Sequence, residues 1–159
     1  MSESTEVLAE IRSSLKGRTL LVGRKVGQDK FDILGATLRV EAKPQEYPTG
    51  GNVIAWKTGL LNEFTDGVFH TIILHRFLYR HVNEYIENPP GILAEAKRIL
   101  PKGGILIVNS FLLDNRTKNF RSAESFFTVE DMRNMLERQS FRKVACVSVG
   151  DTFLFVCEK

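Results

Sequence analysis

The chain has 159 residues and a formal net charge of +3, with 22 lysines and arginines against 19 acids. Its 43% hydrophobic and 26% charged content is that of a folded globular protein and excludes a disordered one. No apolar run approaches the ~20 residues that span a bilayer, and the opening MSESTE lacks the order of a signal peptide. We therefore expect a single cytoplasmic domain over residues 1–159 with no membrane partner, and the small net charge argues against a nucleic-acid partner.

The first element is an N-terminal helix over residues 5–16, with apolar residues on one face and Gly17 as its C-cap. We assign residues 1–17 to this helical segment and residues 18–159 to the core. Apolar segments of strand length alternate with helical ones along the core, which predicts an α/β protein with a mostly parallel sheet. The expected strands cover residues 19–22, 38–42, 53–56, 71–74 and 105–108, and the expected helices cover residues 29–34, 89–100 and a segment that begins at Thr128.

A proline and glycine pattern frames the helix over residues 89–100. Prolines follow Asn88, where a first helical turn tolerates their missing N–H, and Pro101 cannot continue the helix. Gly103 and Gly104 then supply a turn into an entirely apolar strand. This order of helix, glycine turn and buried strand is typical of α/β proteins.

The chain is predicted to end in an antiparallel hairpin that turns at residues 150–151. In that register Cys146 faces Phe155 and Cys157 faces Val144, so the two sulfur atoms are diagonal neighbours. We expect reduced, structural thiols. Alternation of Phe153 with its neighbours gives the hairpin an apolar face, which suggests a homodimer as one alternative.

Three segments together resemble the class I S-adenosylmethionine-dependent methyltransferases. They are AEAKRILPKGGILIV (94–108), LLNEFTDGVFHTIIL (60–74) and FFTVEDMRNMLERQSFRKV (126–144), in the order and spacing of that family. The resemblance implies a Rossmann-like, mostly parallel seven-stranded sheet with a C-terminal antiparallel hairpin and helices on both faces. It also implies S-adenosylmethionine as cofactor and a small molecule or protein as methyl acceptor.

The first strand and the following turn, LLVGRKVG (20–27), are similar to the family's glycine-rich cofactor loop. Such a loop needs glycines because the backbone turns sharply and lies close to the ligand. The resemblance implies that Gly23, Lys25 and Gly27 bind the cofactor, although Leu21 replaces the usual acid and Lys25 the central glycine. The short interval to the next strand also implies a shortened first helix.

Other cofactor positions follow from the same resemblance. Glu41 matches the acid that bonds the ribose hydroxyls, because a carboxylate accepts hydrogen bonds from both; a surface glutamate is the alternative. Trp56 would stack on the adenine, with burial in the core as its alternative. The resemblance places Lys57 and Leu74 beside the cofactor as well.

The catalytic candidates are His75, Tyr79 and His81, which follow the fourth expected strand where the family has acceptor-facing groups. His75 is the best candidate base, since an unperturbed histidine titrates near pH ~6.5; a structural histidine is the alternative. The histidines and cysteines show no metal-ligand spacing, so no metal site is expected.

Three functional hypotheses remain. The first is a methyltransferase that uses S-adenosylmethionine. The second is a methyltransferase-like scaffold or interaction module that has lost the cofactor, which would explain Leu21, Lys25 and the atypical His70. The third is an anion site at the turn around Lys25, for a nucleotide or phosphorylated metabolite. A basic cluster at Arg116, Lys118 and Arg121 is either a solvated loop, which base rates favour, or a contact for an anionic substrate or an RNA backbone.

Overall fold

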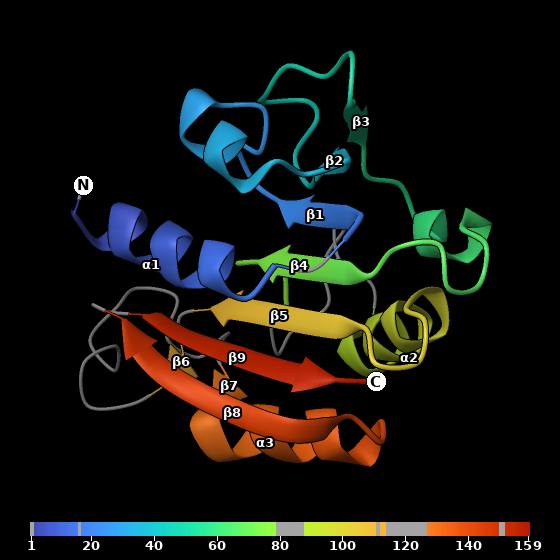
Figure 1. The fold of residues 1–159 in the computed structure, drawn as a ribbon. Helices are drawn as coiled ribbons and strands as arrows, with labels where there is room; N and C mark the ends of the chain where they lie inside the picture. The colour runs from blue at the N-terminus through green and yellow to red at the C-terminus, as the bar shows by residue number, and fades with distance from the viewer. Residues whose placement is uncertain (1, 16, 79–87, 111, 114–126, 150–151) are drawn as a thin grey trace.

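The computed structural model describes residues 2–15, 17–78, 88–110, 112–113, 127–149 and 152–159. Its main feature is a seven-stranded sheet with the order β3-β2-β1-β4-β5-β9-β8 (Figure 1). The strands are β1 (Thr19–Gly23), β2 (Leu38–Glu41), β3 (Val53–Ala55), β4 (Thr71–His75), β5 (Ile105–Ser110), β8 (Arg142–Val149) and β9 (Thr152–Glu158). The short strands β6 (Leu112–Leu113) and β7 (Phe127–Thr128) pair separately.

Strand direction follows the prediction. Strands β3, β2, β1, β4 and β5 run parallel to one another, whereas β9 runs antiparallel to both β5 and β8. The mostly parallel sheet and its C-terminal antiparallel hairpin are therefore confirmed. Because β1 lies between β2 and β4, the carboxyl ends of these three strands share one edge of the sheet.

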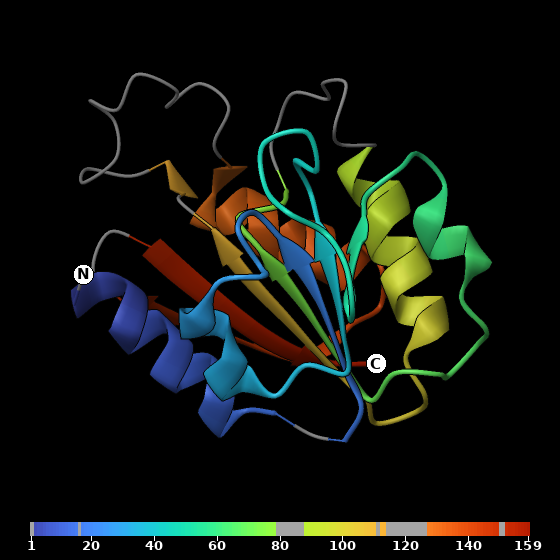
Figure 2. The ribbon, with the colours of Figure 1, turned by 90° about the horizontal axis from the view of Figure 1, so that it is seen from above.

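Helical elements cover both faces of the sheet (Figure 2). Successive strand residues point to opposite faces, so Leu20 and Val22 lie in one core and Leu21 lies in the other. The core of Leu21 is covered by α1 (Ser2–Ser13) and the 3-10 helix η1 (Asp29–Leu34), and the opposite core by η2 (Leu60–Glu63), α2 (Pro89–Ile99) and α3 (Val129–Arg138). None of the helices in the described ranges is long and apolar enough to cross a membrane.

The turn chemistry of α2 matches the prediction. The Asn88 side chain accepts a hydrogen bond from the Gly91 backbone N–H (3.4 Å), and Pro89 occupies the first helical position. Leu100 is extended, as expected for a residue that precedes a proline.

The helix predicted over residues 29–34 is present as a single 3-10 helix, η1. The first helix after β1 is therefore short, as the short interval to the next strand implies.

The expected end of the N-terminal helix was wrong. This helix ends at Ser13, so Gly17 is not its C-cap. Gly17 adopts a left-handed backbone conformation (φ 63°) in the turn that leads into β1. A Cβ atom at Gly17 would lie 2.7 Å from the His70 ring, and this close approach explains the glycine.

The hairpin register is partly as expected. Cys146 does lie opposite Phe155, and a β-bulge between Arg142 and Ala145, where Lys143 has a φ of 53°, leaves Cys157 without a single paired residue on β8. Both cysteines are free thiols. Burial raises the pKa of the Cys157 thiol to about 12, which makes it unreactive at neutral pH.

The hairpin does not present the expected apolar face to a second copy. Phe153, Leu154 and Phe155 are all buried within the sheet's own cores. Val147 in β8 is the one exposed large hydrophobic residue within the described ranges. The alternation of β9 thus serves the packing of this chain on both faces of the sheet.

The start of α3 yields a stability prediction. Thr128 Oγ1 accepts a hydrogen bond from the Asp131 backbone N–H (3.0 Å), so Thr128 caps the helix that was predicted to begin at this residue. We expect Thr128→Ala to lower the free energy of unfolding by about 1 kcal/mol, measured by urea denaturation. Thr128→Ser keeps the hydroxyl and should lose less; equal losses in the two variants would contradict the cap.

Candidate functional site

The carboxyl edge of the parallel strands brings several predicted residues into one row. Gly23 at the end of β1 is in register with Glu41 of β2 on one side and with His75 of β4 on the other. Ala55, which ends β3, is the partner of Glu41. Open parallel sheets bind ligands beyond this edge, where the connections diverge to opposite faces. The fold therefore assembles Gly23, Glu41 and His75 where a ligand is expected.

Gly23 is required by the sheet itself. A Cβ atom at this position would lie 2.6 Å from the backbone oxygen of His75 and 3.1 Å from its Cβ. Gly27 has no such constraint, because a Cβ there would meet only ordinary contacts at 3.6 Å and beyond. The first glycine of the loop thus has a packing role whether or not a cofactor binds.

Lys25 retains a glycine-like backbone in the loop after β1, residues 24–28, which we call the β1 loop. Its φ is 59°, in the left-handed region that costs a non-glycine residue about 1–2 kcal/mol. The side chain is exposed and its ammonium lies 5.5 Å from the centre of the Tyr47 ring. Tyr47 belongs to the connection between β2 and β3, residues 42–52, which we call the β2 loop.

Glu41 joins these two loops from within the protein. Its side chain is fully buried, and its two carboxylate oxygens accept hydrogen bonds from the backbone N–H groups of Val26 (3.2 Å) and Lys43 (2.9 Å). Hydrogen bonds of this kind compensate the cost of burying a carboxylate. Because a carboxylate has about four acceptor positions, its remaining capacity suits the two hydroxyls of a ribose.

The Val26 bond also bears on the hypothesis of an anion site around Lys25. An anion bound at a turn is held largely by backbone N–H groups. The Val26 N–H already donates to Glu41, so this donor is not available to a phosphate. The β1 loop is therefore poorly suited to a phosphate in this conformation.

Of the other predicted cofactor residues, two are buried in the core and one lies on the surface. Trp56 is only 7% exposed, and its ring meets Phe77 edge-on with centroids 4.8 Å apart. Leu74 is completely buried in the same core. Lys57 is exposed and forms an ion pair with Glu63 (2.9 Å). Their roles in cofactor binding remain predictions.

His75 is half-buried against η1, where its ring meets Phe31 edge-on at 5.2 Å. Burial, helped by the positive charges of Arg76 and Lys30, lowers the pKa of His75 to about 3. Its Nδ1 atom is buried and has no hydrogen-bond partner within the described residues. A neutral imidazole with so low a pKa is a weak general base at neutral pH.

Tyr79 and His81, the other catalytic candidates, lie outside the described residues, as does the basic cluster at 116–121.

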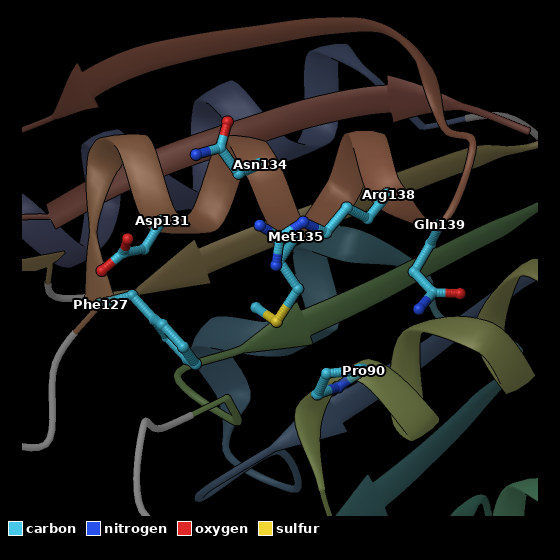
Figure 3. A pocket seen from close by; sticks show the side chains of 7 residues that line it. All are labelled: Pro90, Phe127, Asp131, Asn134, Met135, Arg138 and Gln139. Atoms are coloured by element: carbon cyan, nitrogen blue, oxygen red, sulfur yellow. The ribbon is translucent and has the colours of Figure 1, made fainter.

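A groove lies between α2 and α3, on the face of the sheet opposite to η1 (Figure 3). Its volume is about 250 Å³, and it is open to solvent. Its lining combines apolar side chains with polar ones and consists of Pro90, Phe127, Asp131, Asn134, Met135, Arg138 and Gln139. Small-molecule sites often have such a mixed lining. Among the described residues, none that we predicted to bind cofactor or act in catalysis lines this groove.

Sequence reasoning missed Tyr47. Besides the Lys25 contact, its hydroxyl oxygen accepts a hydrogen bond from Arg24 Nη2 (3.4 Å), so one side chain from the β2 loop contacts two cations of the β1 loop. Tyr47 is an aromatic residue within a turn-rich segment, a signal that could have marked it. Nothing in the sequence, however, places it beside residues that precede it by more than twenty positions.

Known structures agree with the observed fold, although no family model and no curated protein matches the sequence. A Thermotoga maritima protein described as a SAM-dependent methyltransferase, possible histamine N-methyltransferase, superimposes with a TM-score of 0.70 at 20% identity, over 98% of this chain and 89% of its own. A SAM-dependent methyltransferase from Archaeoglobus fulgidus gives 0.72 at 14% identity, over 98% and 94%. PigF, solved with SAH, gives 0.65 at 16% identity over 99% of this chain, which spans 56% of PigF. The chain therefore has the class I S-adenosylmethionine-dependent methyltransferase-like fold.

The different surroundings of Gly23 and Gly27 predict different effects of alanine substitution on stability. We expect Gly23→Ala to reduce the free energy of unfolding by about 2 to 3 kcal/mol, because the backbone of His75 must move to admit the methyl group. Gly27→Ala is the matched control and should change stability by less than about 0.5 kcal/mol. Equal stability of the two variants by chemical denaturation would show that β1 and β4 are not held this closely.

The low pKa of His75 predicts a pH-dependent stability. Below pH 6.5 the unfolded chain takes up a proton on this residue that the folded chain does not, so stability falls as the pH decreases towards 3. Between pH 7 and pH 5, before carboxyl groups titrate, the wild type should lose up to about 2 kcal/mol more than His75→Gln. Chemical denaturation at both pH values measures this difference. Parallel losses in the two proteins would mean that His75 titrates normally.

Proposed function

We propose that this chain is an S-adenosylmethionine-dependent methyltransferase that binds its cofactor at the carboxyl edge of β1 and β2. The observation that carries the proposal is the meeting of Glu41 with the β1 loop, because it joins the predicted ribose acid to the predicted cofactor loop. Glu41 would accept hydrogen bonds from the ribose hydroxyls, and the backbone of the β1 loop would lie against the methionine portion. The acceptor is a small molecule or a protein.

In this proposal the protein mainly aligns the reactants. The cofactor supplies an electrophilic methyl group, and transfer depends chiefly on holding the acceptor's lone pair in line with it. His75 is neutral at physiological pH and is a poor proton acceptor, given its low pKa. This favours an acceptor that needs no strong base, such as an uncharged nitrogen.

The second candidate function is a methyltransferase-like interaction module that does not bind the cofactor. It is favoured by two of the residues that replace family positions, because each of these two has a structural role here. Leu21 is fully buried in the core beneath α1, and His70 packs against Gly17. The complete burial of Glu41 also supports this alternative, since a ribose would need access to its carboxylate.

Calorimetric titration with S-adenosylmethionine and with S-adenosylhomocysteine distinguishes the two functions. The proposed enzyme should bind at least one of them with a dissociation constant in the micromolar range, and Glu41→Ala should weaken binding about tenfold or more through loss of charge-assisted hydrogen bonds. Glu41→Gln is the control, because it can still accept from one backbone N–H while losing the charge. Circular dichroism verifies that each variant is folded. Absence of binding by the folded wild type would favour the interaction module.

A further inference from the structure

The burial of Glu41 has a direct consequence for ligand access, if the proposed function holds. Its side chain has no exposed surface, so no ribose hydroxyl can reach the carboxylate in this conformation. Within the part of the chain that the structure describes, the carboxylate accepts hydrogen bonds from the backbone N–H of Val26, in the β1 loop, and from that of Lys43, in the β2 loop. Cofactor binding at Glu41 therefore requires these two loops to separate.

Tyr47 connects the same two loops from the solvent side of their backbone. Its hydroxyl accepts from Arg24 Nη2 at 3.4 Å, and the Lys25 ammonium lies 5.5 Å from its ring centre. We call these three side chains the clasp. Arg24 and Lys25 are exposed and Tyr47 is half-buried, so water can compete for every contact in the clasp. Cation–π and hydrogen-bond contacts at such exposed positions are weak, and a clasp of this kind can open without unfolding the sheet.

The base of the clasp is fixed locally. The backbone N–H groups of Glu46 and Tyr47 both donate to the Lys43 carbonyl, at 3.0 and 3.2 Å, which forms a compact turn. The Lys43 N–H in the same turn donates to Glu41. A displacement of the Tyr47 side chain therefore acts on a turn that also carries one of the two donors that cover the carboxylate.

We propose that Tyr47 is the residue that controls access to the adenosyl site. In the ligand-free protein the clasp holds the β1 and β2 loops together over Glu41. An S-adenosyl ligand binds after Tyr47 releases Arg24 and Lys25 and the loops part, which exposes the carboxylate to the ribose. Part of the ligand's binding free energy is spent on opening the clasp, so a weaker clasp gives tighter binding.

Hydrogen exchange and ligand binding of Tyr47 variants test this proposal. Tyr47→Ala removes the whole clasp, whereas Tyr47→Phe keeps the ring over Lys25 and loses only the hydroxyl acceptor. Lys30→Ala is the matched control, because Lys30 makes a similar exposed contact with a ring, that of Phe31 at 5.6 Å, outside the clasp. The measurements are the exchange rates of the Val26 and Lys43 amide protons and the dissociation constant of S-adenosylhomocysteine.

We expect Tyr47→Ala to accelerate exchange of both amide protons and to lower the dissociation constant about three- to fivefold, with a smaller change in Tyr47→Phe and none in Lys30→Ala. Unchanged exchange in Tyr47→Ala would overturn the proposal, as would faster exchange with unaltered affinity. If neither the wild type nor any variant binds the ligand, the proposed function fails. Exchange then still decides whether Tyr47 holds the two loops together.

Discussion

The close contact between β1 and β4 at Gly23 is the constraint on which the rest of the site depends. The glycine lets the backbone of His75 approach to a distance that no side chain would allow. With β1 held in this way, the β1 loop leaves the sheet beside the end of β2. The Val26 N–H then meets the carboxylate of Glu41, and the arrangement of the whole edge follows from that contact.

Features typical of a cofactor site therefore also have structural roles in this chain. The first loop glycine permits strand packing, and the acid at the end of β2 satisfies two backbone donors. The same geometry serves a methyltransferase with a closed site or a module that has lost its ligand. A fold shared at 14–20% identity does not choose between them, because function depends on the site.

The sequence predicted the elements of the fold well and the site only in outline. Local patterns are sufficient for the cap at Thr128 and the start of α2 at Asn88, because each depends on neighbours within one helical turn. Burial in the core was one of two alternatives for Trp56, but neither its contact with Phe77 nor the bulge at Lys143 was predicted. Both depend on packing between segments that are distant along the chain or on a register that local spacing cannot specify.

By itself the sequence determined the order of strands and helices, the glycines and prolines that end them, and the placement of Gly23, Glu41 and His75 at one edge of a parallel sheet. Only the tertiary structure decided what surrounds those residues. It buried Glu41 and joined its carboxylate to two loops, lowered the pKa of His75 by burial, and brought Tyr47 to Arg24 and Lys25. The physical reason is that burial and electrostatics depend on every neighbouring element, whereas secondary structure follows largely from local pattern.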